Sequence, residues 1–514
     1  MRPAVELKGI VKRFPGVLAN DHTSLSVAPG EVHALLGENG AGKSTLMQIL
    51  YGSFQADEGE ILLDGHPALF AGQRDAIQSG IGMIHQDFML VRPFTVVENV
   101  VLGLGAGRGG IIDLAGAAAR IEDLSRRHGL NVDPWARIEH LPVGVQQRVE
   151  ILKLLYRDAR VLILDEPTAV LTPQETSTLL ATLRSLAAEG RSIIIVTHKL
   201  HEIIEVADRV TIMRDGRTVA TLDKHATTEA ELARLMVGRD VALKVHRSPL
   251  RRGEPLLAVR ELAVEDDRGE PAVRGIDLTL HAGEIVGIAG VDGNGQSQLV
   301  EALMGLRPAV GGSVAMEGAQ MTDWPPVRRM SSGIAYVPAD RRGVGSVGTL
   351  AIEDNAVLGG QRDFARAGGI LRDRARSRSH AQSLVGRFGV RTPGIRFPAG
   401  KLSGGNLQKL ILGREIMRDP KLLVVEQPTR GLDVGAIEAI WAELLAAREQ
   451  GKGILLISAE LEEIRNLADR ILVIYGGRFM GELSPEEASD QTIGLMMAGI
   501  AASPQRKMDN VEHV

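Results

Sequence analysis

A glycine-rich segment near the start of the chain has the residue types that bind nucleotide phosphates. It reads Gly37-Glu-Asn-Gly-Ala-Gly-Lys43-Ser44-Thr45 and follows an apolar run at 32–36. Glycines let backbone N–H groups approach a phosphate, the lysine neutralises β- and γ-phosphate oxygens, and the serine hydroxyl can ligate Mg²⁺. The full pattern after a predicted strand favours nucleotide binding over an empty glycine turn. We therefore expect ATP and Mg²⁺ here, held by Gly37, Asn39, Gly40, Ala41, Gly42, Lys43, Ser44 and Thr45.

Polar side chains follow three other apolar runs. The run 161–164 ends in Asp165-Glu166, the run 81–84 is followed by Gln86, and the run 192–196 by His198. Such residues can hold Mg²⁺ (Asp165), polarise an attacking water (Glu166), reach metal and water (Gln86) and donate to a γ-phosphate (His198). Each alone is more often an ordinary residue, but their order beside the phosphate loop predicts ATP hydrolysis. The predicted catalytic residues are Lys43, Gln86, Glu166 and His198, and the predicted metal ligands are Ser44, Gln86 and Asp165.

The elements that must position these residues are short β-rich runs alternating with helical patterns, which predicts an α/β core. Segments 97–140 and 352–400 are richer in Ala, Arg and Leu, and their periodicity favours a helical insert in each half. The apolar runs are far shorter than the roughly 20 residues of a membrane span. They are predicted to be buried strands.

The arrangement occurs twice along the 514 residues. Gly290-Val-Asp-Gly-Asn-Gly-Gln296-Ser297 repeats the phosphate loop 253 positions later, and 402–409 repeats 141–148 at an offset of 261, so the second copy carries eight extra residues. Internal repetition at this scale predicts two tandem P-loop NTPase domains, each an α/β core with a helical subdomain. The expected boundaries are a first domain at 1–240, a linker at 241–255, a second domain at 256–500 and a flexible tail at 501–514.

These motifs, in this order, resemble those of the ATP-binding subunits of ABC transporters over nearly the whole chain. In that family two such domains pack head to tail, and each ATP lies between the Walker motifs of one domain and the Leu-Ser-Gly-Gly-Gln signature of the other. The resemblance implies that the second domain contacts the ATP of the first through Ser403, Gly404, Gly405, Asn406 and Asp433. It also implies that Phe14 stacks on adenine, the alternative being a ring packed at a strand edge.

The reciprocal site is predicted to be degenerate. Pro142 in the first signature supplies neither a hydroxyl nor an N–H, and Thr172 stands where the second domain has Asp433. A carboxamide cannot act as a base and alanine cannot donate a hydrogen bond. One complete composite site is therefore expected, while retained donors leave a slow, structural second ATP as a hypothesis. The degenerate set is Gln296, Ser297, Ala339, Glu426, Gln427, Ala459, Pro142 and Thr172.

Tandem domains with one degenerate site resemble the ABC importers of monosaccharides or nucleosides. Segments 141–153, 165–175 and 287–297 are more similar to the nucleoside-uptake branch, from which Pro142 and Ala339 depart. The resemblance implies two integral-membrane permease subunits, whose coupling helices dock beside Gln86 and Ala339, and an extracytoplasmic or lipoprotein solute-binding protein. The alternatives are a ribose- or galactose-type importer, or a soluble tandem ATPase acting on ribosomes or nucleic acid, a class that generally keeps both sites competent.

Composition favours the importer interpretation. The chain has no cysteine, which excludes disulfides and Cys-ligated metal sites and suits a reducing cytoplasm. Its net charge of −5 and 3% aromatic content disfavour a broad nucleic-acid surface. The first residues have neither the basic start nor the apolar stretch of a signal peptide. Together with these observations, the resemblance implies a peripheral membrane protein at the cytoplasmic face of the cell membrane, with no nucleic-acid partner.

Arginines are concentrated in the helical insert of the second half. They stand at positions 362, 366, 372, 374, 376 and 378, in the stretch expected to contain the eight extra residues. A solvated helix face is favoured over contact with anionic head groups or a permease loop.

Overall fold

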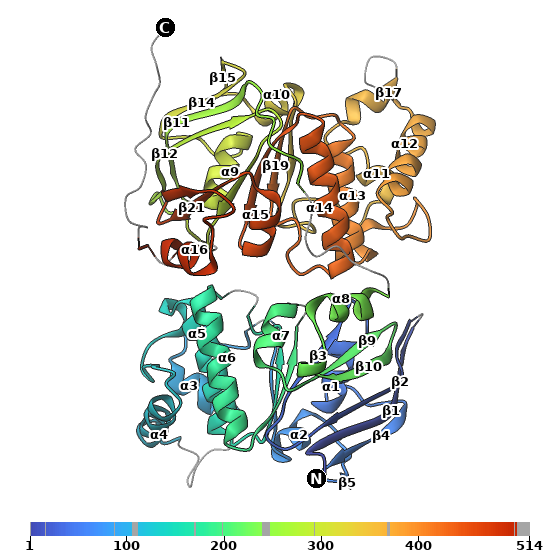
Figure 1. Cartoon of the computed structure of the whole chain (residues 1–514), viewed down its shortest axis with the longest axis vertical. Coiled ribbons are helices and arrows are strands. Elements are labelled where there is room, and N and C mark those ends of the chain that lie inside the picture. Colours follow the sequence, from blue (N-terminus) through green and yellow to red (C-terminus); the bar gives the residue numbers. More distant parts are fainter. Residues whose placement is uncertain are drawn as a thin grey trace. The chain divides into compact units, whose positions relative to one another are not determined.

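The chain forms two compact units, Met1–Val241 and Ala242–Val514. The structure is a computed structural model that describes residues 2–15, 17–86, 88–104, 112–168, 171–197, 199–238, 247–291, 293–366, 371–497 and 499–500. Figure 1 shows the elements of both units, coloured along the sequence. Among the described residues, no helix is both long and apolar enough to cross a bilayer.

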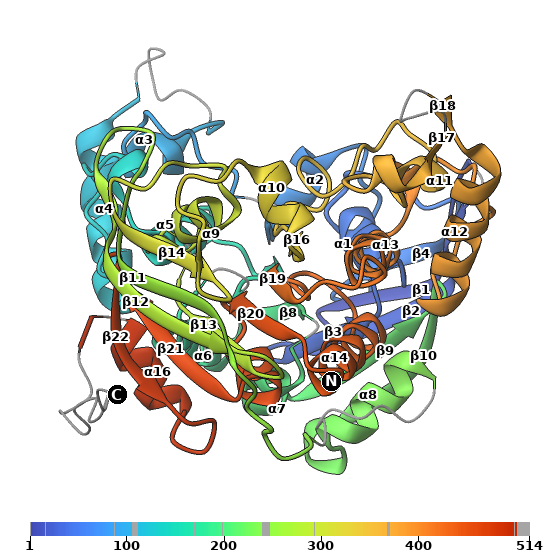
Figure 2. The same cartoon turned by 90° about the horizontal axis from the view of Figure 1, so that it is seen from above.

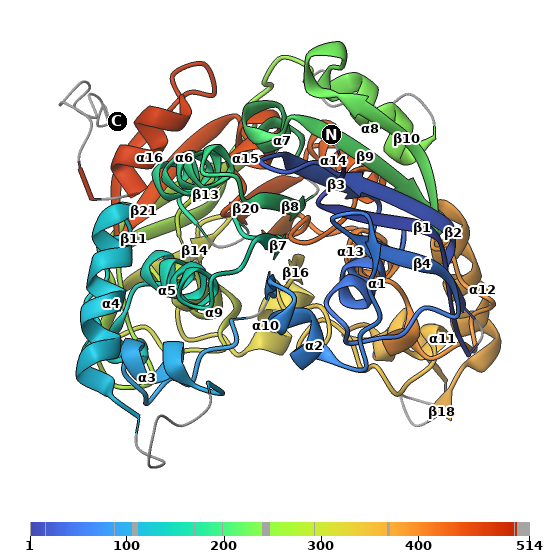
Figure 3. The same ribbon diagram turned by 90° about the horizontal axis from the view of Figure 1, so that it is seen from below.

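The first unit is built on two sheets. One is antiparallel, in the order β2-β1-β4-β5, and lies beside α1 in Figure 3. The other has the order β10-β9-β3-β8-β7-β6, and all its neighbours are parallel except β10 with β9. Their bounds are β1 Val5–Phe14, β2 Val17–Val27, β3 Val32–Gly37, β4 Glu58–Leu63, β5 His66–Pro67, β6 Ile81–Ile84, β7 Val161–Asp165, β8 Ser192–Val196, β9 Arg209–Arg214 and β10 Arg217–Asp223.

The central strands are mostly apolar because both faces of this sheet are covered. Ile163 and Ile194 pack in the cluster shared with the antiparallel sheet and α1, whereas Leu162 and Ile193 pack in the cluster shared with α3 to α6. The helices of the first unit are α1 Lys43–Leu50, α2 Gln73–Gln78, α3 Val96–Val101, α4 Leu114–Arg127, α5 Val143–Tyr156, α6 Pro173–Ala188, α7 Leu200–Val206 and α8 Glu229–Val237, with short 3₁₀ turns η1 Ile138–His140 and η2 Lys224–Ala226.

Strand register places the predicted chemistry at one edge of the sheet. Leu35 of β3 and Asp165 of β7 both pair with Val196 at the end of β8, and Ile84 at the end of β6 pairs with Leu164. Because the strands are parallel, their carboxyl ends meet at the same edge, where ligands bind in open α/β sheets. The phosphate loop, the acidic pair and Gln86 therefore emerge together.

The second unit repeats this architecture. Its sheets have the orders β12-β11-β14-β15 and β16-β19-β20-β13-β21-β22, and a small hairpin pairs β17 with β18. The bounds are β11 Pro255–Glu265, β12 Pro271–His281, β13 Ile285–Ala289, β14 Gly311–Met316, β15 Ala319–Gln320, β16 Ile334–Val337, β17 Ala365–Arg366, β18 Leu371–Arg372, β19 Leu422–Glu426, β20 Gly453–Ser458, β21 Arg470–Tyr475 and β22 Arg478–Leu483.

Helices of the second unit divide between the core and a helical subdomain. In Figure 2, α11 and α12 lie beside the β17–β18 hairpin. Both inserts are thus largely helical, as the sequence predicted, but the hairpin was not expected. The helices are α9 Gln296–Met304, α10 Pro326–Ser331, α11 Ile352–Asn355, α12 Arg374–Arg387, α13 Gly404–Ile416, α14 Val434–Glu449, α15 Leu461–Leu467 and α16 Asp490–Met497, with 3₁₀ turns η3 Gln361–Phe364 and η5 Ala399–Lys401.

The extra residues of the second unit are distributed over three places, not one. Asn99 and Asn355 make equivalent hydrogen bonds to the backbone of Val91 and Val347, which sets an offset of 256. Asp113 and Asp373 cap α4 and α12 at an offset of 260. Only part of the insertion therefore falls in the arginine-rich stretch. The rest lies in the connections before Asn355 and after α12, where surface segments accept added residues without disturbing the core.

The segment predicted as the linker is described from residue 247 onward, where it packs against the second unit. The guanidinium of Arg247 donates to the Ala468 carbonyl, and Ser248 Oγ donates to Glu449 Oε1 at 2.6 Å. Arg252 pairs with the buried carboxylate of Glu284 at 2.9 Å. Residues 241–246 and the predicted tail at 501–514 lie outside the described residues.

Candidate functional site

The first phosphate loop is shaped by its glycines and by strand β2. Gly42 has φ +93°, and a Cβ there would lie 2.2 Å from the Ala19 carbonyl oxygen. Asn20, fully buried on β2, donates from Nδ2 to the Gly42 carbonyl at 3.2 Å. Lys43 Nζ donates to the carbonyls of Gly37 at 2.7 Å and Glu38 at 3.0 Å. The lysine is thus held against the loop at the start of α1, where phosphate is expected.

Oxygen ligands suitable for Mg²⁺ meet beside this loop. The hydroxyl of Ser44 is hydrogen-bonded to the carboxylate of Asp165 at the end of β7. Burial raises the pKa of Asp165, and the neighbouring charge of Glu166 raises it further, while Ser44 and Lys43 oppose the increase. A cation placed here would relieve both unfavourable effects, because it favours the ionised carboxylate. The donor set is one that Mg²⁺ uses together with substrate phosphates.

The predicted base and the predicted glutamine are in direct contact. Gln86 Nε2 donates to Glu166 Oε2 at 3.0 Å. Glu166 adopts a left-handed backbone conformation with φ +50°, and its N–H donates to the Val196 carbonyl at 2.8 Å. A non-glycine residue in this conformation stores strain, which is found preferentially at functional sites. The side chain is thereby turned out of the strand end toward Gln86.

Two further residues predicted for the first site are Phe14 and His198. Phe14 packs edge-on against Phe54, with ring centroids 5.4 Å apart, and Lys12 Nζ lies 5.6 Å from its centroid. The ring remains partly exposed, so stacking on adenine stays a prediction. His198 lies outside the described residues. Asn39 and Gly40 are exposed on the loop, Ala41 is buried under it, and Thr45 lies in the first turn of α1.

In the second phosphate loop, a glutamine side chain bonds to the loop itself. Gln296 is buried, and its Nε2 donates to the Val291 carbonyl at 2.9 Å, as Lys43 does at the corresponding Glu38. Its Oε1 accepts the N–H of Asn294 at 3.1 Å, a bond that lysine cannot make because it has no acceptor. The carboxamide therefore accepts the Asn294 N–H, whereas the corresponding Ala41 N–H of the first loop donates to the Glu38 carbonyl at 3.1 Å.

Several other positions that the sequence predicts to be degenerate form hydrogen bonds within the second unit. Glu426 accepts hydrogen bonds from Ser297 Oγ at 3.2 Å and from the Tyr336 hydroxyl at 2.7 Å, and burial together with Glu426 raises the pKa of Tyr336. Gln427, with φ +47°, accepts the Ala459 N–H at 3.1 Å. The carboxamide of Gln427 thus bonds to the backbone, whereas the carboxylate of Glu166 accepts from the side chain of Gln86. Ala339 is exposed after β16 and has no polar side chain.

The signature segments differ at their helix caps. Ser403 Oγ caps α13 and accepts from Asn406 Nδ2 at 2.8 Å, and Asp433 caps α14 by accepting the Ala436 N–H at 2.8 Å. In the first unit, Pro142 precedes α5 without a side-chain cap, whereas Thr172 caps α6 in a capping box with Glu175. Gly404 and Gly405 form the first turn of α13, and a Cβ at Gly405 would approach Ala436 Cβ to 2.9 Å.

Three features of the sites were not found from the sequence. Asn20 supports the phosphate loop from a strand whose pairing is not visible in the sequence, and Tyr336 contacts Glu426 only because β16 and β19 are neighbours. The left-handed conformation of Glu166 also depends on tertiary context.

Comparison with known proteins identifies the family. The ABC transporter family matches residues 20–169 and 273–430, together more than half of the chain. A glucose import ATP-binding protein of Haloferax volcanii is 47% identical over 97% of this chain and 96% of its own length. A guanosine import ATP-binding protein of Bacillus subtilis is 47% identical over 97% and 98%. A nucleoside import ATP-binding protein of Lactococcus lactis is 45% identical over 96% and 98%.

A solved structure supports the tandem fold. The archaeal ribosome recycling factor, crystallised with a ribosomal stalk protein, aligns with 98% of this chain and 94% of its own at a TM-score of 0.62 and 19% identity. At this identity the likeness concerns the fold alone. Together with the repeated sheets and phosphate loops, these findings show that the chain belongs to the ABC transporter family, with two ATP-binding domains in tandem.

Proposed function

We propose that the chain is the ATP-hydrolysing subunit of a nucleoside importer and that it hydrolyses ATP at one site only. The observation that carries this proposal is the difference between two glutamine contacts. In the first unit Gln86 meets the carboxylate of Glu166 at 3.0 Å, beside the Ser44–Asp165 pair. In the second unit the residue at the base position is Gln427, which bonds to the Ala459 backbone.

The residues of the first unit divide the chemistry among them. Lys43 and the loop amides would bind the β- and γ-phosphates, while Ser44 and Asp165 would hold Mg²⁺, which when bound stabilises the charge of the phosphoryl oxygens. Glu166 would accept a proton from the attacking water, and Gln86 orients that carboxylate. The proposed second-domain contribution comes from the capped helix starts at Ser403 and Asp433, where backbone N–H groups and the helix dipole favour an anion.

Matched variants of the two base positions test the single-site proposal. Glu166→Gln keeps the size of the side chain but removes the base, and we expect steady-state ATPase activity to fall by about 10²–10⁴-fold. Gln427→Glu retains an oxygen to accept the Ala459 N–H, and we expect activity to stay within about twofold, because that position is not proposed to do chemistry. Substantial turnover by Glu166→Gln, measured with the permease present, would refute a single catalytic site.

The second site is proposed to bind nucleotide weakly or not at all. Gln296 lacks the charge of Lys43, and its carboxamide bonds to the Asn294 N–H and the Val291 carbonyl of its own loop. Ser297 and Glu426 keep the contact that Ser44 and Asp165 make in the first site, so the proposed difference rests on the loop residue Gln296. Counting ATP molecules per chain in the Glu166→Gln variant by equilibrium dialysis tests this. One tightly held nucleotide per chain supports the proposal, whereas two would contradict it.

Nucleoside import is proposed on the names of relatives that span almost the whole chain. Two of the three reported relatives are guanosine and nucleoside import proteins, at 47% and 45% identity. The alternative is sugar import, because the glucose import protein is equally similar at 47%. Uptake of labelled guanosine, ribose and glucose by a strain lacking this chain, with and without its return, separates them. Loss of sugar uptake with intact nucleoside uptake would overturn the nucleoside proposal.

The proposed partners are two permease subunits and an extracytoplasmic solute-binding protein, with this chain at the cytoplasmic face of the membrane. The coupling helices of the permease would dock beside the Gln86 and Ala339 loops. Tagged chain should therefore copurify with integral membrane proteins from detergent extracts. Copurification with ribosomes in their place would support the soluble tandem-ATPase alternative.

A further inference from the structure

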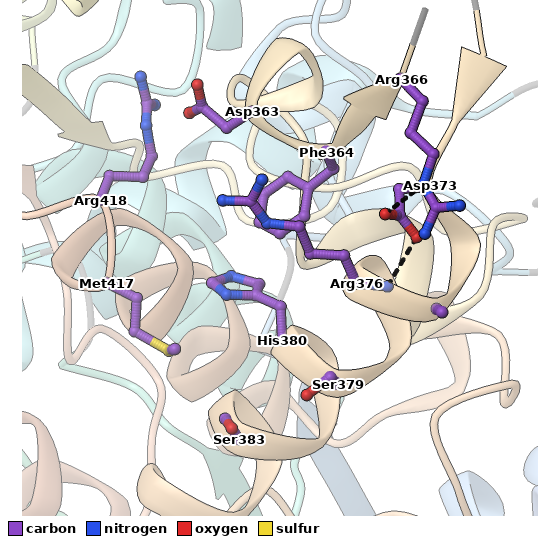
Figure 4. A pocket seen from close by; sticks show the side chains of 11 residues that line it. Asp363, Phe364, Arg366, Asp373, Arg376, Ser379, His380, Ser383, Met417 and Arg418 are labelled. Atoms are coloured by element: carbon purple, nitrogen blue, oxygen red, sulfur yellow. Dashed lines mark hydrogen bonds and ion pairs between the residues drawn. The ribbon is translucent and has the colours of Figure 1, made fainter.

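A basic cavity in the helical subdomain of the second unit has no role in ATP binding. It has a volume of about 770 Å³ and lies between η3, the start of α12 and the end of α13. Figure 4 shows its walls, with Arg376 reaching over the ring of Phe364, and His380, Ser379 and Ser383 projecting from α12. Arg418 approaches from the end of α13. The cavity is open to solvent, and Arg376, Ser379 and Ser383 in its walls are exposed.

The cavity arises from two replacements relative to the first domain. There, Arg120 of α4 stacks on the ring of Tyr156, 4.4 Å from its centroid, and donates to the Tyr156 carbonyl at 3.0 Å. The corresponding positions in the second unit hold the smaller side chains of His380 and Met417, which line the cavity. A stacked pair that fills space in one copy is thus replaced by an opening in the other.

Two of the three arginines that line the cavity form ion pairs with carboxylates, and the third, Arg376, does not do so within the part of the chain that the structure describes. Arg366 pairs with Asp373 at 2.5 Å, and Arg418 donates to Glu415 at 3.0 Å. The guanidinium of Arg376 lies 5.7 Å from the centroid of Phe364 and pairs with no carboxylate of the described residues. A guanidinium held against an aromatic ring keeps its N–H groups directed sideways, where a planar oxyanion can be bound by two of them.

Other donors face the same space. Ser379 and Ser383 lie one helical turn apart on α12, and within the described part of the chain their hydroxyls have no hydrogen-bond partner. Burial lowers the pKa of His380, as does the nearby charge of Arg376, although a backbone hydrogen bond to Ala356 opposes this. The imidazole is therefore neutral at pH 7 and adds a hydrogen-bonding group without charge. One acidic wall residue, Asp363, limits the net positive charge.

We propose that this cavity binds a phosphate monoester, with Arg376 as its main ligand and Arg418, Ser379 and Ser383 as further donors. A bare phosphate would fill a small part of about 770 Å³, so the open space beside it can accommodate an attached organic group. This group is either the remainder of a soluble metabolite or the glycerol backbone of a lipid. Guanidinium and hydroxyl donors are the groups that recognise phosphate in proteins.

The test uses the full chain saturated with Mg²⁺ and ADP, so that the first phosphate loop is occupied, and an excess of ADP is kept in every titration. The soluble arm titrates glycerol 3-phosphate by calorimetry, and the lipid arm measures flotation with phosphatidylcholine vesicles with and without phosphatidate. Arg376→Gln should weaken binding by about tenfold or more, since it removes charge-assisted hydrogen bonds. Arg374→Gln, an exposed arginine two positions away on α12 that does not line the cavity, should change it by less than about twofold.

A third variant should change the affinity in the opposite direction. Asp363→Asn removes the acidic wall residue and should tighten binding, which no loss of folding would do. Binding in either arm with this pattern supports the proposal and identifies the soluble or lipid source. The proposal is overturned if neither probe binds, or if Arg374→Gln weakens binding as much as Arg376→Gln does. It is also overturned if the cavity binds neither probe and is instead covered when a permease is added, because the site would then be a protein contact.

Discussion

Glu463 is a carboxyl group buried in the second unit, at a place where the first unit has an ion pair. It lies on α15 and accepts a hydrogen bond from Trp441 Nε1 at 3.1 Å. Burial raises its pKa to about 7, against the opposing influence of Ser458, Thr429 and Trp441, and nearby Glu460 adds to the increase. In the first unit, Glu202 lies 3.6 Å from Lys199 and accepts from Thr168 at 2.8 Å. Lys199 corresponds to Glu460, so the cation has been lost from the second copy.

This burial should make stability fall as the pH rises from about 4.5 to about 7. In that interval the unfolded chain ionises this carboxyl at its ordinary pKa of 4.5, whereas the folded chain keeps its proton. The folded state therefore loses stability progressively and the loss is complete above about pH 7. A pKa difference of this size corresponds to about 3 kcal/mol.

Glu463→Gln should remove this pH dependence while it preserves an acceptor for Trp441. We expect the variant to exceed the wild type in free energy of unfolding by about 2 kcal/mol more at pH 8 than at pH 5. Urea unfolding followed by tryptophan fluorescence at four pH values measures the difference, in which the titration of all other groups cancels. The comparison between pH values also cancels any fixed effect of exchanging a carboxyl for a carboxamide.

Glu202→Gln is the matched control, because it makes the same change where a lysine is present. There we expect a loss of stability at neutral pH, since the charge of Lys199 loses a nearby carboxylate. The reasoning about Glu463 would be refuted if the advantage of Glu463→Gln failed to grow between pH 5 and pH 8. It would be refuted equally if Glu202→Gln showed the same growing advantage.

Two further predictions concern backbone geometry and buried hydrogen bonds. Gly42→Ala should abolish ATP binding measured by equilibrium dialysis, because the new Cβ would lie 2.2 Å from the Ala19 carbonyl oxygen. Gly40 has φ +85° but no atom of the described residues within 4 Å of an added Cβ, so Gly40→Ala should cost only about 1 kcal/mol of strain and retain ATP binding. Asn355→Ala should lower the free energy of unfolding by about 2–4 kcal/mol in urea titrations, because fully buried Asn355 bonds to backbone groups at Val347, Leu350 and Ala351; a loss below about 0.5 kcal/mol would contradict this.

The sequence was informative where chemistry and strand order coincide. Lys43, Asp165 and Glu166 follow apolar runs, and parallel pairing brings the ends of such runs together, so their proximity could be predicted. Contacts that depend on side-chain direction could not. The loss of lysine at Gln296 was visible, but the bond from the Asn294 N–H to its carboxamide depends on the path of the loop.

The arginine-rich stretch shows a second limit. The pattern of Arg374, Arg376 and Arg378 favoured a uniform solvated helix face. In the structure Arg374 and Arg376 are both exposed, in agreement with a solvated face, but Arg376 also lines a cavity and Arg378 pairs with Glu353 at 3.2 Å. Spacing of two along a helix distributes side chains around its circumference, so neighbouring arginines meet different surroundings. The sequence gives the charge of such a segment but not the neighbours that each charge meets.

The helix caps limit which substitutions the nucleotide-facing loops can accept. Asp433 and Thr172 each satisfy the first backbone amides of a helix, and replacing such a cap by alanine costs typically about 1 kcal/mol. Thr172 has lost the carboxylate of its counterpart but keeps an oxygen in the same place. Folding therefore favours a hydroxyl or carboxylate at these positions whether or not the residue contacts a nucleotide. A polar residue at such a position is explained by the helix that it caps, and its presence alone does not indicate a nucleotide contact.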